Sequence, residues 1–149
     1  MLKAKRIRLK KVVFLTNTDT TIGFISKSKK ALDIAKNRTP NKVYIEVLPS
    51  LKALRKRVPK KYKKLVRRAK KTTFILNQTY SFRVSYNNKH NLLLNRLNGA
   101  YSSSANESNK NYDYNYAYKN ADIIIYPLGN KNKPSKIYKL SSKKIKKIR

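Results

Sequence analysis

Short runs of β-branched, aromatic and other apolar residues recur along the chain, and most are bounded by turn-forming residues. Runs of this length and composition are typical of buried β-strands. They predict a central sheet whose strands lie at residues 12–15, 43–48, 73–76, 82–86 and 123–126, with further strands at 100–103 and 135–140.

Helical patterns lie between several of these strands. Helices are predicted at residues 27–35, 60–70 and 90–97, the first beginning near Ser28. Helices that alternate with strands, together with a hairpin-like pair at 72–86, predict an α/β fold with a twisted sheet of parallel and antiparallel strands. The Asn- and Tyr-rich stretch 109–120 is predicted to be a loop with a short helix.

The length of 149 residues predicts a single domain. We expect residues 1–10 to form a basic N-terminal arm and residues 141–149 a basic C-terminal tail. The longest apolar stretches are strand-sized and too short to cross a bilayer. The charged N-terminus is not followed by the apolar segment of a signal peptide, so we expect a cytoplasmic protein without a membrane partner.

Net charge changes this picture most. The chain has 38 lysines and arginines against 6 acidic residues, a net charge of +32. Polyanions should stabilise such a chain because they relieve repulsion among its cations. We therefore expect tRNA or another RNA to bind the basic surface. The cations are spread over the whole chain, so a compositional bias of the genome is an alternative explanation.

The scarcity of acids, His and Cys limits the chemistry. The chain has no cysteine, three glycines and one histidine, His90, which we expect to be solvated beside Lys89. This composition argues against a serine–histidine–carboxylate triad, a cysteine- or histidine-rich metal site and a glycine-rich phosphate loop. A nucleotide enzyme with these residues would work through cations, hydroxyls and amides, and no residue is predicted to ligate a metal.

A basic turn follows the helix predicted at 27–35. It carries Lys36, Arg38 and Lys42, and Pro40 forces the turn because the residue before a proline avoids helical dihedrals. Three cations on a short connection between two ordered elements suit an anion with several oxygens, such as a triphosphate. The alternative is a solvated basic loop, which the overall charge by itself favours.

Hydroxyl and amide side chains gather at two other places, and a single arginine is a further candidate. The stretch 16–23 follows a predicted strand, where it could meet a ligand, or where Thr18 or Asp19 could cap a following turn. Ser104-Ala105-Asn106 offers neutral donors, although an ordinary polar turn has the same composition. Arg83 lies inside a predicted strand, where it is either solvated or an anion ligand on a sheet face.

The order of these clusters resembles the YrdC-like threonylcarbamoyl-AMP synthase family. Thr18-Asp19-Thr20-Thr21-Ile22-Gly23 resembles its Thr-Asp-Thr-Val-Tyr-Gly segment, Lys36-Asn37-Arg38 its Lys-Gly-Arg motif, and Ser103-Ser104-Ala105-Asn106 its Pro-Ser-Ala-Asn motif. The similarity covers residues 11–140 in the family's order. It implies a YrdC-like fold with a concave, positively charged cleft, and it favours ligand binding by the basic turn.

The resemblance also implies an activity and a site. Members of the family join L-threonine, bicarbonate and ATP into threonylcarbamoyl-adenylate and release pyrophosphate, for threonylcarbamoyladenosine modification of tRNA. By this resemblance, catalytic roles fall to Lys36, Arg38, Ser104 and Asn106, nucleotide binding to Thr73, Ser102 and Arg149, and substrate binding to Thr18, Thr20, Lys42, Arg83 and Ser135. Mg²⁺ is expected with the triphosphate, and other tRNA-modification proteins are expected partners.

A second hypothesis comes from a different class of protein. The chain could be a noncatalytic protein that binds double-stranded RNA or tRNA and keeps an idle YrdC-like cleft. The charge of +32 fits both hypotheses. Threonine- and bicarbonate-dependent exchange between ATP and pyrophosphate would distinguish them.

Overall fold

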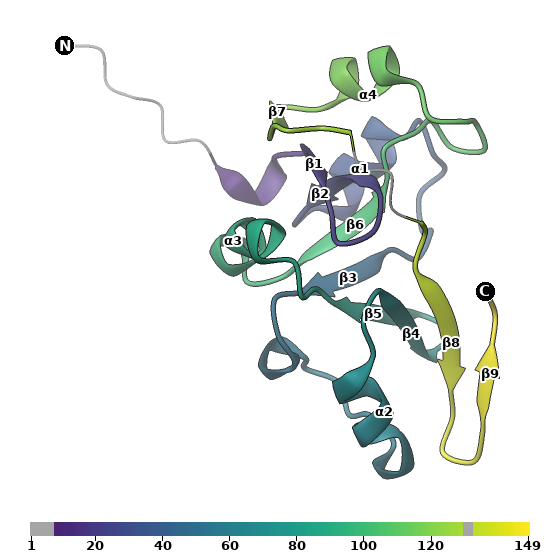
Figure 1. Ribbon diagram of the computed structural model, residues 1–149. Coiled ribbons are helices and arrows are strands. Elements are labelled where there is room, and N and C mark those ends of the chain that lie inside the picture. The colour runs from purple at the N-terminus through teal and green to yellow at the C-terminus, as the bar shows by residue number, and fades with distance from the viewer. Residues whose placement is uncertain (1–7, 130–132) are drawn as a thin grey trace.

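The computed structural model describes residues 8–129 and 133–149, and in these residues nine strands form one sheet (Figure 1). The strands are β1 (Phe14–Asn17), β2 (Ile22–Ser26), β3 (Ile45–Leu48), β4 (Thr72–Asn77), β5 (Tyr80–Val84), β6 (Ala100–Ser104), β7 (Ile123–Ile124), β8 (Lys136–Leu140) and β9 (Ile145–Lys147). Their order in the sheet is β7-β1-β2-β6-β3-β5-β4-β8-β9. The pairs β1–β7, β3–β5 and β4–β8 are parallel and the others antiparallel, which confirms the mixed α/β sheet.

The start of α1 and the end of α3 lie at residues suited to those positions. They are α1 (Lys29–Ala35), α2 (Lys63–Arg68), α3 (Asn88–Leu97) and α4 (Tyr114–Asn120), with single 3₁₀ turns at Leu9–Lys11, Leu51–Ala53 and Lys60–Tyr62. The Ser28 hydroxyl caps α1 by accepting a hydrogen bond from the Ala31 amide at 3.1 Å. Asn98 ends α3 in the left-handed conformation, with φ 54°.

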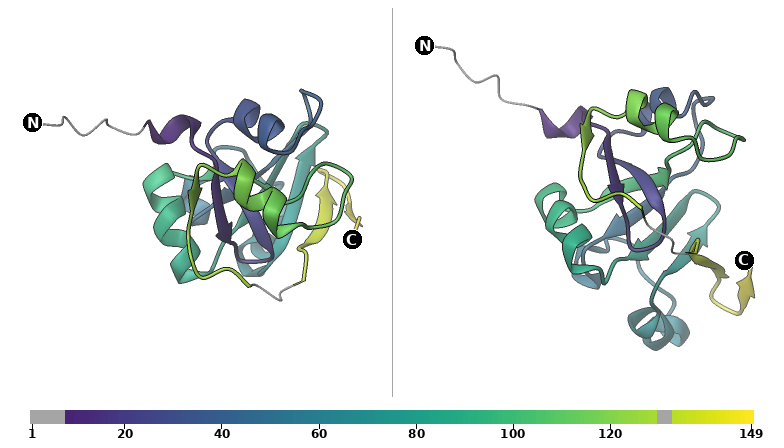
Figure 2. Two further views of the ribbon diagram at one scale, coloured as in Figure 1. Left: turned by 90° about the horizontal axis from the view of Figure 1, so that it is seen from above. Right: turned by 45° about the horizontal axis from the view of Figure 1, so that its top comes forward.

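Two core clusters lie on opposite faces of β1 and β2. Successive residues of a strand point to opposite sides, so Leu15 and Phe24 join one cluster while Phe14 and Ile25 join the other. Helices α1 and α4 cover the first face through Leu32, Ala35 and Ala117, and α3 covers the second face through Leu94 and Leu97. The two views of Figure 2 agree with this layering.

The third cluster lies beneath β4 and β5, where α2 packs through Val66. Phe82 and Val84 of β5 belong to it. Arg83, between them, therefore points to the other side of the sheet, where it lines a cavity. The antiparallel β4–β5 hairpin was predicted from the sequence and is confirmed.

Several segments differ from the sequence-based expectations. Residues 141–149 were expected to be a tail, but they contain β9. This strand pairs antiparallel with β8, with Tyr138 opposite Lys147, Lys139 opposite Lys146 and Leu140 opposite Ile145. The strand predicted at 123–126 is reduced to two residues. Most of the expected N-terminal arm, residues 1–7, lies outside the described residues.

No helix in the described part of the chain is both long enough and apolar enough to span a membrane.

Candidate functional site

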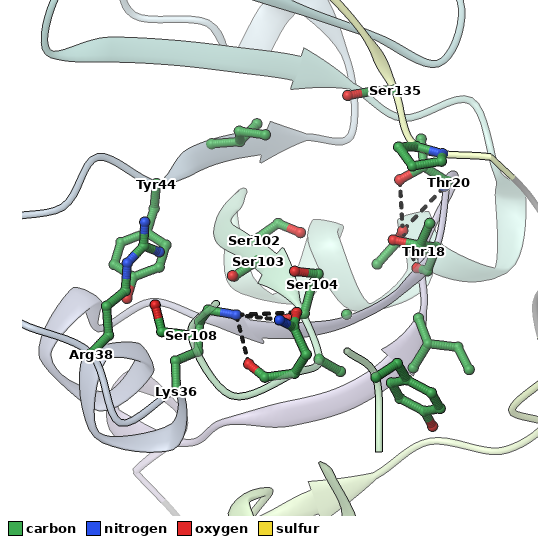
Figure 3. A pocket seen from close by; sticks show the side chains of 18 of the residues that line it. Thr18, Thr20, Lys36, Arg38, Tyr44, Ser102, Ser103, Ser104, Ser108 and Ser135 are labelled. Atoms are coloured by element: carbon green, nitrogen blue, oxygen red, sulfur yellow. Dashed lines mark hydrogen bonds between the residues drawn. The ribbon is translucent and has the colours of Figure 1, made fainter. Parts of the chain in front are cut away.

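A cavity of about 770 Å³ opens where the β1–β2 turn, the end of α1, β6 and the segment before β8 meet (Figure 3). The predicted site residues that line it are Thr18, Thr20, Lys36, Arg38, Arg83, Ser102, Ser104, Asn106, Ser135 and Arg149. Lys36 and Arg38 lie at one end, while Thr18, Thr20 and Ser135 lie at the other. No Asp or Glu is present among the described residues that line it.

Lys36 anchors the cationic end. It follows α1 as the C-cap and is only 4% exposed. Its ammonium donates hydrogen bonds to the carbonyl oxygens of Ser104 and Asn106, both at 2.8 Å, and lies 3.4 Å from Asn106 Oδ1. Burial, and to a smaller extent the charge of Arg38, lowers the pKa of Lys36 from 10.5 to about 8. The ammonium therefore joins α1 to the chain that leaves β6.

Arg38 is held by an aromatic ring. Its guanidinium carbon lies 5.0 Å from the centre of the Tyr44 ring, a cation–π geometry. The Tyr44 hydroxyl donates to Asp33 Oδ1 at 2.6 Å, which fixes the ring. Burial, together with this hydrogen bond, raises the pKa of Tyr44 to about 12. Arg38 Nε is buried and has no hydrogen-bond partner among the described residues, so an oxygen of a ligand could satisfy it.

The opposite end of the cavity is formed by the β1–β2 turn. The Thr18 hydroxyl donates to the Thr21 carbonyl at 2.6 Å and accepts from the Thr20 amide at 3.1 Å. Thr18 thus caps the turn between β1 and β2, which agrees with the capping alternative given by the sequence. Both threonines also line the cavity, as the other alternative expected.

A buried polar network supports that end. Arg83 Nε donates to both carboxylate oxygens of Asp19, at 3.1 and 3.0 Å, and each side chain is 4% exposed. Arg83 Nη1 donates to the Thr73 hydroxyl at 3.4 Å, and that hydroxyl lies 2.8 Å from Ser135 Oγ. Arg149 Nε then donates to the Ser135 carbonyl at 3.0 Å. Thr73 therefore acts beneath the cavity rather than on its surface.

Asn106 fixes the loop beside the cationic end. Its side-chain amide donates to the carbonyl oxygens of Glu107 and Lys110, at 2.8 and 2.7 Å. The Ser108 amide donates to the Lys36 carbonyl at 3.0 Å and ties the same loop to the end of α1. Asn106 thus shapes the rim of the cavity with its amide group while its Oδ1 faces Lys36.

Lys42 lies elsewhere. It is exposed and lines a second cavity of about 890 Å³, outside the first. Arg38 and Val43 line both cavities and separate them. The turn therefore directs two of its three cations, Lys36 and Arg38, to the first cavity.

Two features of the site, and the burial of one residue outside it, were not predicted from the sequence. Asp19 pairs with Arg83, and the Tyr44 ring packs against Arg38. The scarcity of acidic residues was the only sequence signal for these contacts, and it concerned the Asp19–Arg83 pair. His90 was expected to be solvated, but it is 3% exposed in α3, and both ring nitrogens lack a partner in the described part of the structure. Burial, with a smaller effect of Arg83, lowers the pKa of His90 from 6.5 to about 4.

Within residues 8–129 and 133–149, no three His, Asp or Glu side chains gather where they could hold a metal ion.

Neither a family model nor a curated protein sequence matches the chain. Solved structures do match. A variant of Sua5 from P. abyssi superposes with a TM-score of 0.77 at 17% identity over 93% of this chain and 52% of Sua5. Sua5 from P. abyssi complexed with L-threonine gives 0.73 at 17% identity, over 93% of this chain and 50% of that one. YciO from E. coli gives 0.73 at 18% identity, over 93% and 82%.

The chain thus spans about half the length of the two Sua5 structures and most of YciO. Sua5 and YciO are members of the YrdC/Sua5 family. The resemblance seen in the ordered sequence motifs is confirmed at the level of the fold. This chain has the YrdC-like fold.

Proposed function

We propose that this protein is a nucleotidyltransferase of the threonylcarbamoyl-AMP synthase type. It forms threonylcarbamoyl-adenylate from L-threonine, bicarbonate and ATP, for threonylcarbamoyladenosine modification of tRNA. The observation that carries the proposal is the single cavity with Lys36 and Arg38 at one end and the Thr18, Thr20 and Ser135 hydroxyls at the other. Its volume of about 770 Å³ is in the range of small-molecule sites.

The reaction needs charge stabilisation more than acid–base catalysis. The threonine amine and bicarbonate form a carbamate with loss of water. A carbamate oxygen then attacks the α-phosphorus of ATP, a P–O bond forms, and the bond to the β-phosphate oxygen breaks to release pyrophosphate. Negative charge grows on the phosphate oxygens and the leaving group, and fixed cations stabilise it.

Arg38 is assigned to the phosphates. Its guanidinium is oriented by Tyr44, and its unpartnered Nε could donate to a phosphate oxygen. Lys36 adds positive charge and holds the β6 end through the Ser104 and Asn106 carbonyls, so that Ser104 and Asn106 stay beside the reacting groups. ATP would enter as its magnesium complex, with the metal held by phosphate oxygens and water.

The hydroxyl end is assigned to L-threonine. Thr18, Thr20 and Ser135 line that end of the cavity with hydroxyl groups suited to contact an amino acid. Arg83 supports Ser135 through Thr73. The Sua5 structure complexed with L-threonine has the same fold, which supports this substrate. Ser102 and Arg149 line the cavity and are assigned to the nucleotide, whereas Lys42 is given no part in the reaction because it faces the second cavity.

The test is pyrophosphate release that depends on both threonine and bicarbonate. Arg38→Ala should lower it by about two to three orders of magnitude, the loss typical of one preorganised donor. Lys143→Ala is the matched control, since Lys143 is an exposed cation outside the cavity and should leave the rate unchanged. Circular dichroism would establish that both variants fold. Release that is independent of threonine, or a folded Arg38→Ala variant with full activity, would contradict the proposal.

The second candidate is a noncatalytic RNA-binding protein with an idle cavity. The net charge of +32 fits this candidate as well as the first, because a charge of this size promotes RNA binding whether or not the cavity is active. RNA binding without any threonine-dependent pyrophosphate release would establish this second function.

A further inference from the structure

Four tyrosines form an exposed cluster on and around α4. Tyr112, Tyr114, Tyr118 and Tyr126 are 47, 47, 51 and 63% exposed, which is high for aromatic side chains of this size. We call these four residues the tyrosine cluster. It belongs to the Asn- and Tyr-rich stretch 109–120 and the end of the segment after β7, and the proposed reaction uses none of it.

The folding of α4 explains why these rings are outside. Tyr116 and Ala117 turn inward: the Tyr116 hydroxyl donates to the Ala35 carbonyl at 2.7 Å, and Ala117 is fully buried against α1. Tyr114 and Tyr118, four residues apart, therefore share the outward side of the helix. Figure 1 shows α4 at the edge of the molecule, above α1, where a large ligand could approach it.

The rings of the tyrosine cluster are organised. The Tyr114 and Tyr118 ring centres are 5.8 Å apart with an angle of 35° between the ring planes. Tyr126 lies beside Tyr114, and interaction with the Tyr114 side chain raises the pKa of Tyr126. Tyr112 lines the first cavity, which Lys36 and Arg38 also line, so the cluster extends outward from the rim of that cavity.

Charge selects the kind of partner. The chain as a whole carries +32, so it attracts polyanions. Acids in the surrounding segments are already engaged: Asp113 accepts a hydrogen bond from the Asn115 amide at 2.9 Å, Asp122 accepts one from the Val13 amide at 2.8 Å, and Glu107 is paired with Lys110 at 2.7 Å. Lys119 is exposed beside Tyr118. Exposed aromatic rings on a cationic protein are the usual platform for unpaired nucleobases, while phosphates contact the surrounding cations.

We propose that the tyrosine cluster binds single-stranded RNA by stacking unpaired bases on Tyr114 and Tyr118. Bases in a duplex are already stacked on one another, so the cluster would favour single strands and loops over helical RNA. The stacking would add a base-dependent term to binding that is otherwise electrostatic. This inference does not require adenylate formation, and its test contains no ATP, so either proposal can fail while the other stands.

The test is fluorescence anisotropy at physiological salt with a labelled, unstructured RNA of about twelve nucleotides, which suits a single binding site. The double variant Tyr114→Leu/Tyr118→Leu keeps apolar side chains but removes the rings, and it should weaken binding about 10-fold or more. Tyr114→Phe/Tyr118→Phe keeps the rings and should retain most of the affinity. Leu92→Ala is the control, because Leu92 is 70% exposed on α3, which packs on the opposite face of β1 and β2.

Two further RNAs separate stacking from charge. A duplex and an abasic strand with the same number of phosphates should bind the wild-type protein and the double leucine variant equally. The chain has no tryptophan, so its intrinsic emission comes from tyrosine, and stacking should quench it with the base-containing strand only. Equal affinity of the wild-type and double leucine proteins for the single strand would overturn the proposal and leave a protein partner to explain the cluster. The proposal would also be overturned if the double leucine variant lost as much affinity for the abasic strand as for the base-containing strand.

Discussion

Asp19 and Arg83 form a buried ion pair in which Nε of Arg83 donates to both carboxylate oxygens of Asp19, at 3.1 and 3.0 Å. The two residues are 64 positions apart, and each is 4% exposed. The pair fixes the β1–β2 turn to β5, so the hydroxyl end of the cavity depends on it. A buried pair of this kind is most informative when one partner is removed.

Asp19→Ala should destabilise the protein by about 3–5 kcal/mol, because it leaves the Arg83 guanidinium buried without a counter-charge. The double variant Asp19→Ala/Arg83→Met should recover much of this loss, since no unpaired charge remains. Urea unfolding measures both. Lys110→Gln removes the exposed Glu107–Lys110 pair and should have little effect. A double variant no more stable than Asp19→Ala would show that the pair does not act as a unit.

The Tyr44 ring should control Arg38. Tyr44→Phe loses the hydrogen bond to Asp33 but keeps the ring under the guanidinium, so the KM for ATP should change little. Tyr44→Leu removes the cation–π contact, and the freed Arg38 should bind ATP about 3- to 10-fold more weakly. Steady-state pyrophosphate release gives both constants. Equal KM values for the two variants would mean that the ring does not orient Arg38.

Lys36 should impose a pH limit on activity. Its ammonium is the form that stabilises phosphate charge, and its pKa is lowered to about 8, so kcat/KM for ATP should fall as the pH rises through about 8. Lys36→Arg keeps a positive charge at that pH and should move the decline to higher pH. Bound ATP should also raise the pKa of Lys36, which an NMR titration of Nζ measures. A decline at the same pH in Lys36→Arg would assign it to another group.

His90 should make the fold sensitive to mild acid. Its pKa is about 4 in the folded protein against 6.5 for an ordinary imidazole, so the unfolded chain binds the proton first. The stability contributed by the neutral ring is present above pH 6.5 and is lost as the pH falls towards 4, about 3 kcal/mol in all. His90→Leu should flatten the dependence of unfolding free energy on pH in that window. Lys89→Gln, one position away, should retain the wild-type slope.

Gly23 should be irreplaceable beside the cavity. A Cβ at this position would lie 2.9 Å from the Ser103 carbonyl oxygen and 3.0 Å from Thr18 Cγ2. Gly23→Ala should therefore push β2 away from β6, lower the melting temperature and reduce pyrophosphate release together. Thermal unfolding and the activity assay check this. A variant as stable and active as the wild type would show that the β2–β6 pairing tolerates the methyl group.

Much of the fold could be predicted because local sequence signals mark where several helices and strands begin or end. Ser28 marks the start of α1 as its cap, the alternation around Phe82 marks β5, and Asn98 marks the end of α3. Each of these depends on residues a few positions apart. Arg38, Lys36 and the serines of β6 were predicted to belong to one site by the order of the motifs, and they line one cavity.

The remaining features depend on distant residues and left no local signal. His90 follows a lysine on a polar stretch, yet it is buried because the sheet lies against its side of α3. Residues 143–149 look like a solvated tail because four of them are lysines, but β8 offers them an unpaired edge. Lys42 was grouped by sequence with Lys36 and Arg38 in the basic turn, whereas in the fold it lines the second cavity.

The contacts that build the cavity have a consequence for how the protein folds. The Thr73–Ser135, Arg83–Asp19 and Lys36–Asn106 contacts join residues 62, 64 and 70 positions apart. Contacts between such distant residues form slowly, because long loops must close first. The local β4–β5 hairpin and α3 can form early, but neither contains a complete binding site. A nascent or partly folded chain would therefore already carry its charge and attract RNA before it could bind a nucleotide.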